Sequence, residues 1–184
     1  MLVKASDGVI EGNRIENSSL GGIIVTPELY WGEGDYVRNV TITGNSIRNV
    51  CTGKQCYGGL ALGALAPGEV FAAGPAYGHR GVIISNNYFE NISFANLWLS
   101  SADGVVVSNN TIRYPFAYPS VATCCPPVRP LPTRTVVFAT SSGSVEFADN
   151  CIVDALPPGT AVPFNATASV RDLKLVGGGV RTCP

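Results

Sequence analysis

The sequence predicts an all-β chain that folds as a right-handed parallel β-helix, a solenoid of about four to five coils. Three observations lead to this prediction. A short phrase, in which an apolar strand ends at an asparagine corner, recurs along the chain, and a second set of apolar strands lies between its copies. Valine and isoleucine favour strands, and 21 glycines and 13 prolines supply frequent turns. The 184 residues are expected to form a single domain, residues 1–184.

The recurring phrase has five copies, which end at Asn13, Asn45, Asn87, Asn110 and Asn150 with spacings of 32, 42, 23 and 40 residues. A period that never falls below about 20 residues but varies upwards is typical of a coil of fixed size that accepts insertions. Asparagine tolerates a left-handed turn and can hydrogen-bond to an equivalent asparagine in the next coil. We therefore expect an asparagine ladder at one corner of the solenoid.

The strands between these corners are 22–25, 60–62, 97–99 and 136–138. Alternate residues are expected to fill the core, and each strand is expected to pair in parallel with its equivalent one coil away. Coils are predicted over about residues 7–155, with a C-terminal strand or cap at 156–184. Because the first coil has no cap before it, an N-terminal portion of the solenoid is expected upstream. An antiparallel β-sandwich is the alternative, although sandwiches rarely repeat one corner residue five times.

Cysteine and asparagine patterns predict a secreted, glycosylated protein, whose leader would have been removed or would lie upstream. Five Asn-x-Ser/Thr sequons begin at Asn17, Asn39, Asn91, Asn109 and Asn165. The six cysteines, Cys51, Cys56, Cys124, Cys125, Cys151 and Cys183, allow three disulfides. We expect Cys51 to bond with Cys56. Adjacent cysteines seldom bond each other, so Cys151 and Cys183 are the expected partners of Cys124 and Cys125, with the pairing left open.

Charge and hydropathy exclude two classes of partner. The net charge is −1 with only 14% charged residues, which provides no basic surface for nucleic acid. No stretch approaches the roughly 18 apolar residues of a membrane span, so no membrane insertion is expected. No cysteine, histidine or carboxylate cluster has the spacing of a metal site, and no cofactor is expected.

The repeat resembles that of the pectin-lyase-like superfamily over about residues 7–155. That resemblance implies three strand faces per coil, with the asparagine corner between the second and third faces. It places the strands 23–25, 60–62, 97–99 and 136–138 on the first face. The two longest insertions, 26–38 and 64–80, follow first-face strands, so their polar residues and the short turn at 100–104 are expected to share one edge.

This edge is the predicted carbohydrate site. Alternation along the strand at 97–99 directs Trp98 outward, where an indole could stack against a sugar ring beside carboxylates. The candidate catalytic residues are Glu28, Glu33 and Asp103. The candidate substrate-binding residues are Tyr30, Trp31, Asp35, His79, Arg80 and Trp98, and Glu69 lies on the same edge. Structural roles are the alternatives: acids that order loops, an aspartate that accepts backbone N–H groups in a turn, a histidine at a loop end, and a tryptophan covered by a loop.

Residues 23–42 resemble the core segment of glycoside hydrolase family 110, the exo-acting α-galactosidases. The resemblance implies a hydrolase in which two carboxylates act on the glycosidic bond. Parallel rungs about 4.8 Å apart can supply such pairs. The family has paired aspartates where this chain has Pro27-Glu28, so one acid lacks a counterpart.

The predicted function is therefore binding or processing of an oligo- or polysaccharide by a secreted β-helix. The missing acid favours the alternative of a non-catalytic extracellular surface or wall module. A polysaccharide lyase is a second alternative, in which carboxylates from several coils, such as Asp35 and Asp103, would hold a cation and Arg80 would act as base.

Overall fold

A computed structural model describes residues 1–27, 32–53, 56–66, 69–72, 77–116, 134–154, 156 and 161–184, with only the backbone given for 65–66 and 69–72. Every regular element in these ranges is a β-strand. Two large sheets contain only parallel strand pairs, and a two-stranded antiparallel sheet joins β8 (Ala64–Ala66) to β9 (Glu69–Ala72). The predicted all-β class is confirmed.

The first sheet has six strands in the order β1-β4-β7-β12-β16-β18. They are β1 (Leu2–Val3), β4 (Ile23–Val25), β7 (Leu60–Leu62), β12 (Leu97–Ser100), β16 (Thr135–Thr140) and β18 (Val162–Ala166). Ile23 pairs with Leu60, Leu60 with Leu97, and Leu97 with Val137. Equivalent residues of successive repeats therefore lie side by side, as the sequence predicts.

The second sheet has eleven strands in two parallel runs that share β17 (Val145–Ile152). One run contains β2 (Gly8–Glu11), β5 (Arg38–Thr43), β10 (His79–Ser85) and β14 (Val105–Ser108). The other contains β3 (Arg14–Glu16), β6 (Ser46–Arg48), β11 (Tyr88–Glu90) and β15 (Thr111–Arg113). Short β13 (Ala102–Asp103) pairs with β10, and β19 (Leu173–Thr182) pairs with β17 along both of its halves.

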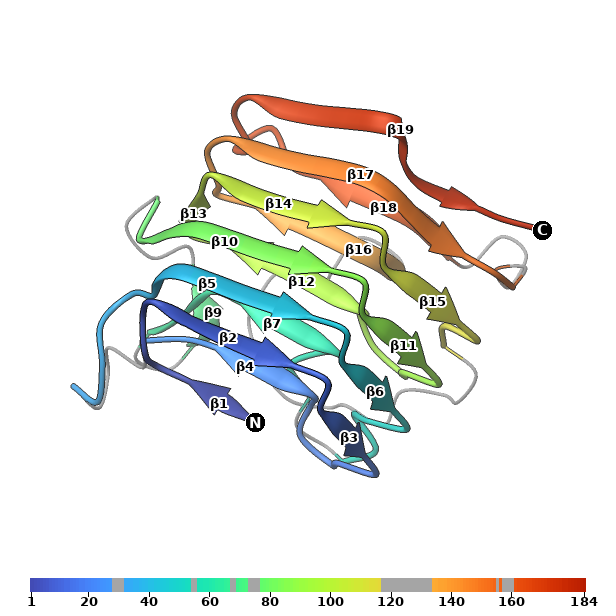
Figure 1. Ribbon diagram of the computed structural model, residues 1–184, viewed down its shortest axis with the longest axis horizontal. Helices are drawn as coiled ribbons and strands as arrows, with labels where there is room; N and C mark the ends of the chain where they lie inside the picture. The colour runs from blue at the N-terminus through green and yellow to red at the C-terminus, as the bar shows by residue number, and fades with distance from the viewer. Residues whose placement is uncertain are drawn as a thin grey trace.

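Successive repeats are stacked in chain order from the N-terminal to the C-terminal edge, as Figure 1 shows. In each repeat before the last, the chain passes from the first sheet to the β2 run and then, through an asparagine corner, to the β3 run. Strands β18 and β19 extend both sheets by one further repeat at the C-terminal end. The large sheets are thus parallel, unlike those of an antiparallel β-sandwich.

The predicted asparagine ladder is present. The side-chain amide of Asn45 donates to Oδ1 of Asn87 at 2.9 Å, and that of Asn87 donates to Oδ1 of Asn110 at 3.0 Å. The same pattern joins Asn13 to Asn45 and Asn110 to Asn150. The left-handed backbone falls one residue earlier than predicted, on Gly12, Gly44, Asn86, Asn109 and Asp149. The preceding residue makes the turn, and the ladder asparagine is free to point inward and bond.

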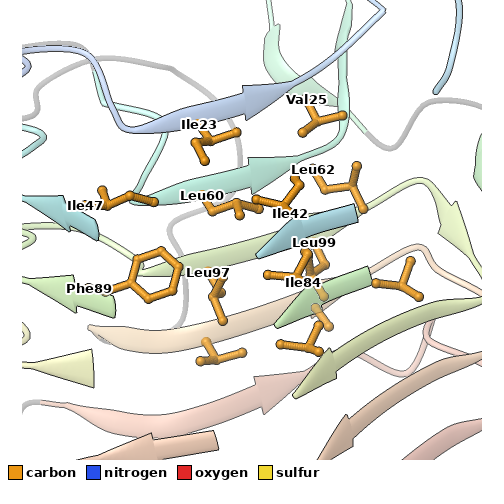
Figure 2. Packing of buried hydrophobic residues seen from close by; sticks show 14 of the residues in the cluster. Ile23, Val25, Ile42, Ile47, Leu60, Leu62, Ile84, Phe89, Leu97 and Leu99 are labelled. Carbon is orange, nitrogen blue, oxygen red and sulfur yellow. The ribbon is translucent and has the colours of Figure 1, made fainter. Parts of the chain in front are cut away.

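The core lies between the sheets and consists of aliphatic side chains stacked in columns (Figure 2). Ile23, Leu60 and Leu97 form one column on the first sheet, opposite Ile42 and Ile84 of the second sheet. All are fully buried. Because burial of one such side chain contributes about 1.5–3 kcal/mol, these columns are a major source of stability.

Two disulfides are present among the described residues. Cys51 bonds with Cys56, as predicted. Cys151 bonds with Cys183, so the expectation that these two pair with Cys124 and Cys125 is wrong. Register explains the difference, because β17 and β19 place Cys151 opposite Arg181, only two residues from Cys183. Cys124 and Cys125 lie outside the described residues.

Candidate functional site

Several residues predicted to act on a carbohydrate lie outside the described part of the chain. These are Glu28, Tyr30 and Trp31, together with the side chain of Glu69. Of the acids on the same insertion that are described, Glu33 is exposed and forms an ion pair with Lys4. Asp35 accepts the backbone N–H of Tyr36 at 2.7 Å. Both contacts match the alternative of loop-ordering acids, although the partner of Glu33 comes from the N-terminal segment.

Trp98 is buried, which corrects the expectation of an exposed indole. Only 3% of its surface is accessible, and it packs with the rings of Phe94 and Phe138 at centroid distances of 5.8 and 6.3 Å. The alternation itself is right, because Leu97 and Leu99 belong to the main core whereas Trp98 belongs to a separate cluster. That outer side of the sheet is covered, so the indole provides no platform for a sugar ring.

His79 is fully buried, which corrects its assignment to substrate binding. Its Nε2 lies 2.8 Å from the carbonyl oxygen of Gly63, and its Nδ1 accepts the backbone N–H of Val37 at 3.2 Å. These partners require the neutral tautomer with hydrogen on Nε2. Burial lowers the pKa of His79 to about 4, outweighing the Gly63 hydrogen bond and the charge of Asp35, which both raise it. The residue joins two insertions instead of contacting solvent.

Arg80 and Asp103 lie on adjacent strands at one edge, as predicted. They are direct partners in the β10–β13 register, and Arg80 is exposed. Oδ1 of Asp103 accepts the backbone N–H of Ser144 at 3.0 Å. Asp103 thus accepts a backbone N–H group, as the structural alternative predicts. The donor, however, lies in the following repeat.

A polar depression lies at this edge, where four successive turns lead into β10, β14, β17 and β19. Its volume is about 280 Å³, and its lining residues are Tyr77, Asp103, Gly143, Ser144, Arg171 and Asp172. Backbone hydrogen bonds hold the turns together, with Gly143 N–H donating to Ala102 O at 2.7 Å and Arg171 N–H donating to Ser142 O at 2.9 Å. We refer to these six residues as the polar depression.

Arg171 stacks on Tyr77 within the depression, with its guanidinium carbon 4.4 Å from the ring centroid. Such cation–π contacts hold both side chains in place. A Cβ atom at Gly143 would lie 2.5 Å from Oδ1 of Asp103 and 3.0 Å from Cδ1 of Tyr77. The absence of a side chain at Gly143 therefore allows Asp103 and Tyr77 both to approach the backbone at this position.

The depression brings together hydrogen-bond donors, acceptors and an aromatic ring. Arg171 supplies guanidinium donors, Asp103 and Asp172 supply carboxylate acceptors, and Tyr77 supplies a ring edge and a hydroxyl. The sequence identified Asp103 but missed Tyr77, Arg171 and Asp172. These three residues share a position that the sequence could have indicated, because each lies in the turn just before a strand of the second sheet.

No three His, Cys, Asp or Glu side chains gather as possible metal ligands in the described ranges. Within those ranges there is also no helix long and apolar enough to cross a membrane. Comparison of the chain with protein-family models, with curated proteins and with solved structures gives no match.

Proposed function

We propose that this protein is a secreted carbohydrate-binding module, built as a right-handed parallel β-helix of the pectin-lyase-like type. In this proposal the polar depression holds a sugar unit. The single observation that carries the proposal is the Arg171–Tyr77 stack beside Asp103 in a depression of about 280 Å³.

The β-helix assignment is supported by register and by the ladder. Three parallel runs of strands pair residue for residue across successive repeats, and buried asparagines join the repeats at one corner. A solenoid in which each repeat contacts its neighbours accounts for both features.

Sugar binding is supported by the chemistry of the depression. Sugars present paired hydroxyl groups beside apolar C–H surfaces, which suit charged hydrogen-bonding side chains next to an aromatic ring. Sites for drug-sized ligands range upwards from about 300 Å³, and a single sugar ring is smaller than such a ligand, so a volume near 280 Å³ leaves room for one ring. Stacking of Arg171 on Tyr77 limits the rotamer entropy that binding would otherwise remove.

Binding is favoured over cleavage by the structural roles of the acids. Asp103 accepts the backbone N–H of Ser144 and thereby joins two turns. Glu33 is paired with Lys4, and Trp98 is buried. A glycoside hydrolase is the second candidate because two carboxylates, those of Asp103 and Asp172, line the same depression.

Secretion and glycosylation are supported by the two disulfides and by the sequons. Disulfides persist mainly in oxidising compartments. Asn17 and Asn109 are exposed at corners of the fold. The Asn91 amide, in contrast, donates to Oδ1 of Asn49 at 3.1 Å, so we propose that glycans occupy Asn17 and Asn109 before Asn91.

The test is a glycan array probed with the secreted protein and with Tyr77→Ala and Arg171→Ala. Both substitutions are expected to reduce retention at least tenfold. Tyr114→Ala is the matched control, because Tyr114 also stacks with an arginine, Arg113, but lies on a different corner. Absence of glycan retention by the wild-type protein, or equal retention by all variants, would overturn the proposal.

A parallel assay for product release from the retained glycans separates the two candidates. Release that Asp103→Asn or Asp172→Asn abolishes would establish the hydrolase. Retention without release would establish the binding module.

A further inference from the structure

A second hollow adjoins the polar depression on the strand side of the same turns. This hollow has a volume of about 180 Å³ and shares Ser144 and Asp172 with the depression. The residues that add to it are Gly104, Val105, Val106, Val145, Glu146 and Lys174. We call it the strand-side hollow.

The two compartments are aligned with the strands. On each of three neighbouring repeats, the chain leaves the depression and enters the hollow within a few residues, as from Asp103 to Val106 and from Asp172 to Lys174. Strands β14, β17 and β19 are parallel neighbours, which Figure 1 shows at the C-terminal end of the stack. Because the two compartments share Ser144 and Asp172 and lie along the same strands, we refer to them together as the groove.

The lining of the hollow differs from that of the depression. Val106 pairs in register with Glu146, and Glu146 pairs with Lys174, so an apolar side chain, an acid and a base follow one another across the strands. Val106 and Glu146 are half-buried, and Lys174 is exposed. A sugar ring offers C–H surface to the valine and hydroxyl groups to the two charged side chains.

We infer that the groove binds an oligosaccharide of at least two linked units, one in each compartment, with its chain along the strand direction. The inference rests on the proposed function and deepens it. Each compartment is smaller than the sites of drug-sized ligands, which begin at about 300 Å³, so we assign one ring to each. The shared Ser144 and Asp172 lie at the junction, where the glycosidic linkage would pass.

The experiment compares ligands of one, two and three units by calorimetry. The probes are the methyl glycosides of glucose, galactose, mannose and galacturonate, and the α- and β-linked homo-oligomers of each. The variants are wild type, the double variant Glu146→Ala/Lys174→Ala, and Thr41→Ala as control. Thr41 lies in the same outward-facing register as Val106 but outside the groove.

We expect affinity to rise at least tenfold from one unit to two in the wild type and in Thr41→Ala. In the double variant this ratio should fall to about one. Equal affinity for one and two units, or a ratio that the double variant retains, would overturn the two-compartment groove while leaving the polar depression as a sugar site. Failure of every probe to bind, together with a blank glycan array, would instead overturn the proposed function.

Discussion

The backbone N–H of Val37 donates a 3.2 Å hydrogen bond to Nδ1 of His79, a residue 42 positions later in the chain. The same imidazole reaches Gly63 O through Nε2, so one neutral ring joins two insertions at the edge that carries the polar depression. Protonation of Nδ1 would remove the acceptor and leave a buried charge. The stability of this edge is thereby linked to pH.

We predict that the free energy of unfolding falls as the pH drops from about 6.5 to about 4. The folded-state pKa of His79 is lowered to about 4, so the unfolded state takes up the proton first and is favoured in this window. The contribution is fully present above pH 6.5 and amounts to about 3 kcal/mol. Urea unfolding at a series of pH values measures it. His79→Gln should remove this part of the pH dependence, and an unchanged pH profile in that variant would contradict the prediction.

Asn87→Ala is expected to destabilise the protein by about 3 kcal/mol or more, since several buried polar groups lose their partners at once. Oδ1 of Asn87 accepts from both the backbone and the side chain of Asn45, and its amide donates to Ile42 O and to Asn110. The neighbouring Asn86 is exposed and has a left-handed backbone that glycine adopts readily. Asn86→Gly is therefore the control, with an expected change within about 0.5 kcal/mol. Chemical denaturation of both variants checks the difference, and equal losses would contradict it.

Gly143→Ala should weaken glycan binding at least tenfold. The new methyl group would lie 2.5 Å from Oδ1 of Asp103, so the aspartate or the turn must move. Gly8→Ala is the matched control, because a Cβ there would meet only one atom within 4 Å, at 3.9 Å, and neither glycine has a positive φ. Titration with the glycan that the wild-type protein retains measures the effect. Undiminished affinity in Gly143→Ala would contradict the prediction that the positions of Asp103 and Tyr77 over this turn matter for binding.

Replacing Cys151 and Cys183 together by serine should cost about 4 kcal/mol, the chain-entropy value for a loop of this length. The loop closed by Cys51 and Cys56 spans only 5 residues, so its double serine variant should cost about 2 kcal/mol. Urea unfolding compares the two. The backbone N–H of residue 183 donates to Ile152 O at 2.8 Å, and its hydrogen exchange should increase in the first variant only. A larger loss from the shorter loop would contradict the prediction.

Sequence alone predicted the features that depend on local period. The corner asparagines were found from spacing, because each repeat must return an asparagine to the same place for the ladder to form. Parallel pairing of Leu60 with Leu97 follows from the same period. The Cys51–Cys56 disulfide was predictable because its partners lie 5 residues apart.

Burial of Trp98 and His79 was decided only by the tertiary structure. Strand alternation fixes the side of the sheet on which Trp98 lies, but Phe94 and Phe138, from another segment and another repeat, determine that this side is covered. His79 has the sequence context of a loop end, and its partners are Gly63, 16 residues earlier in the same repeat, and Val37, from the preceding repeat. Strand alternation specifies the side of the sheet to which a side chain points, whereas its burial depends on which other segments pack against that side.

The polar depression shows the same division. The sequence determined that this chain repeats, where its strands and corners fall, and that Asp103 lies at an edge with Arg80. Only the tertiary structure brought Arg171 onto Tyr77, placed Gly143 beneath them and paired Cys151 with Cys183. The physical reason is that insertions of unequal length separate equivalent turns, so contacts between repeats depend on the register of the stacked strands and not on distance along the chain.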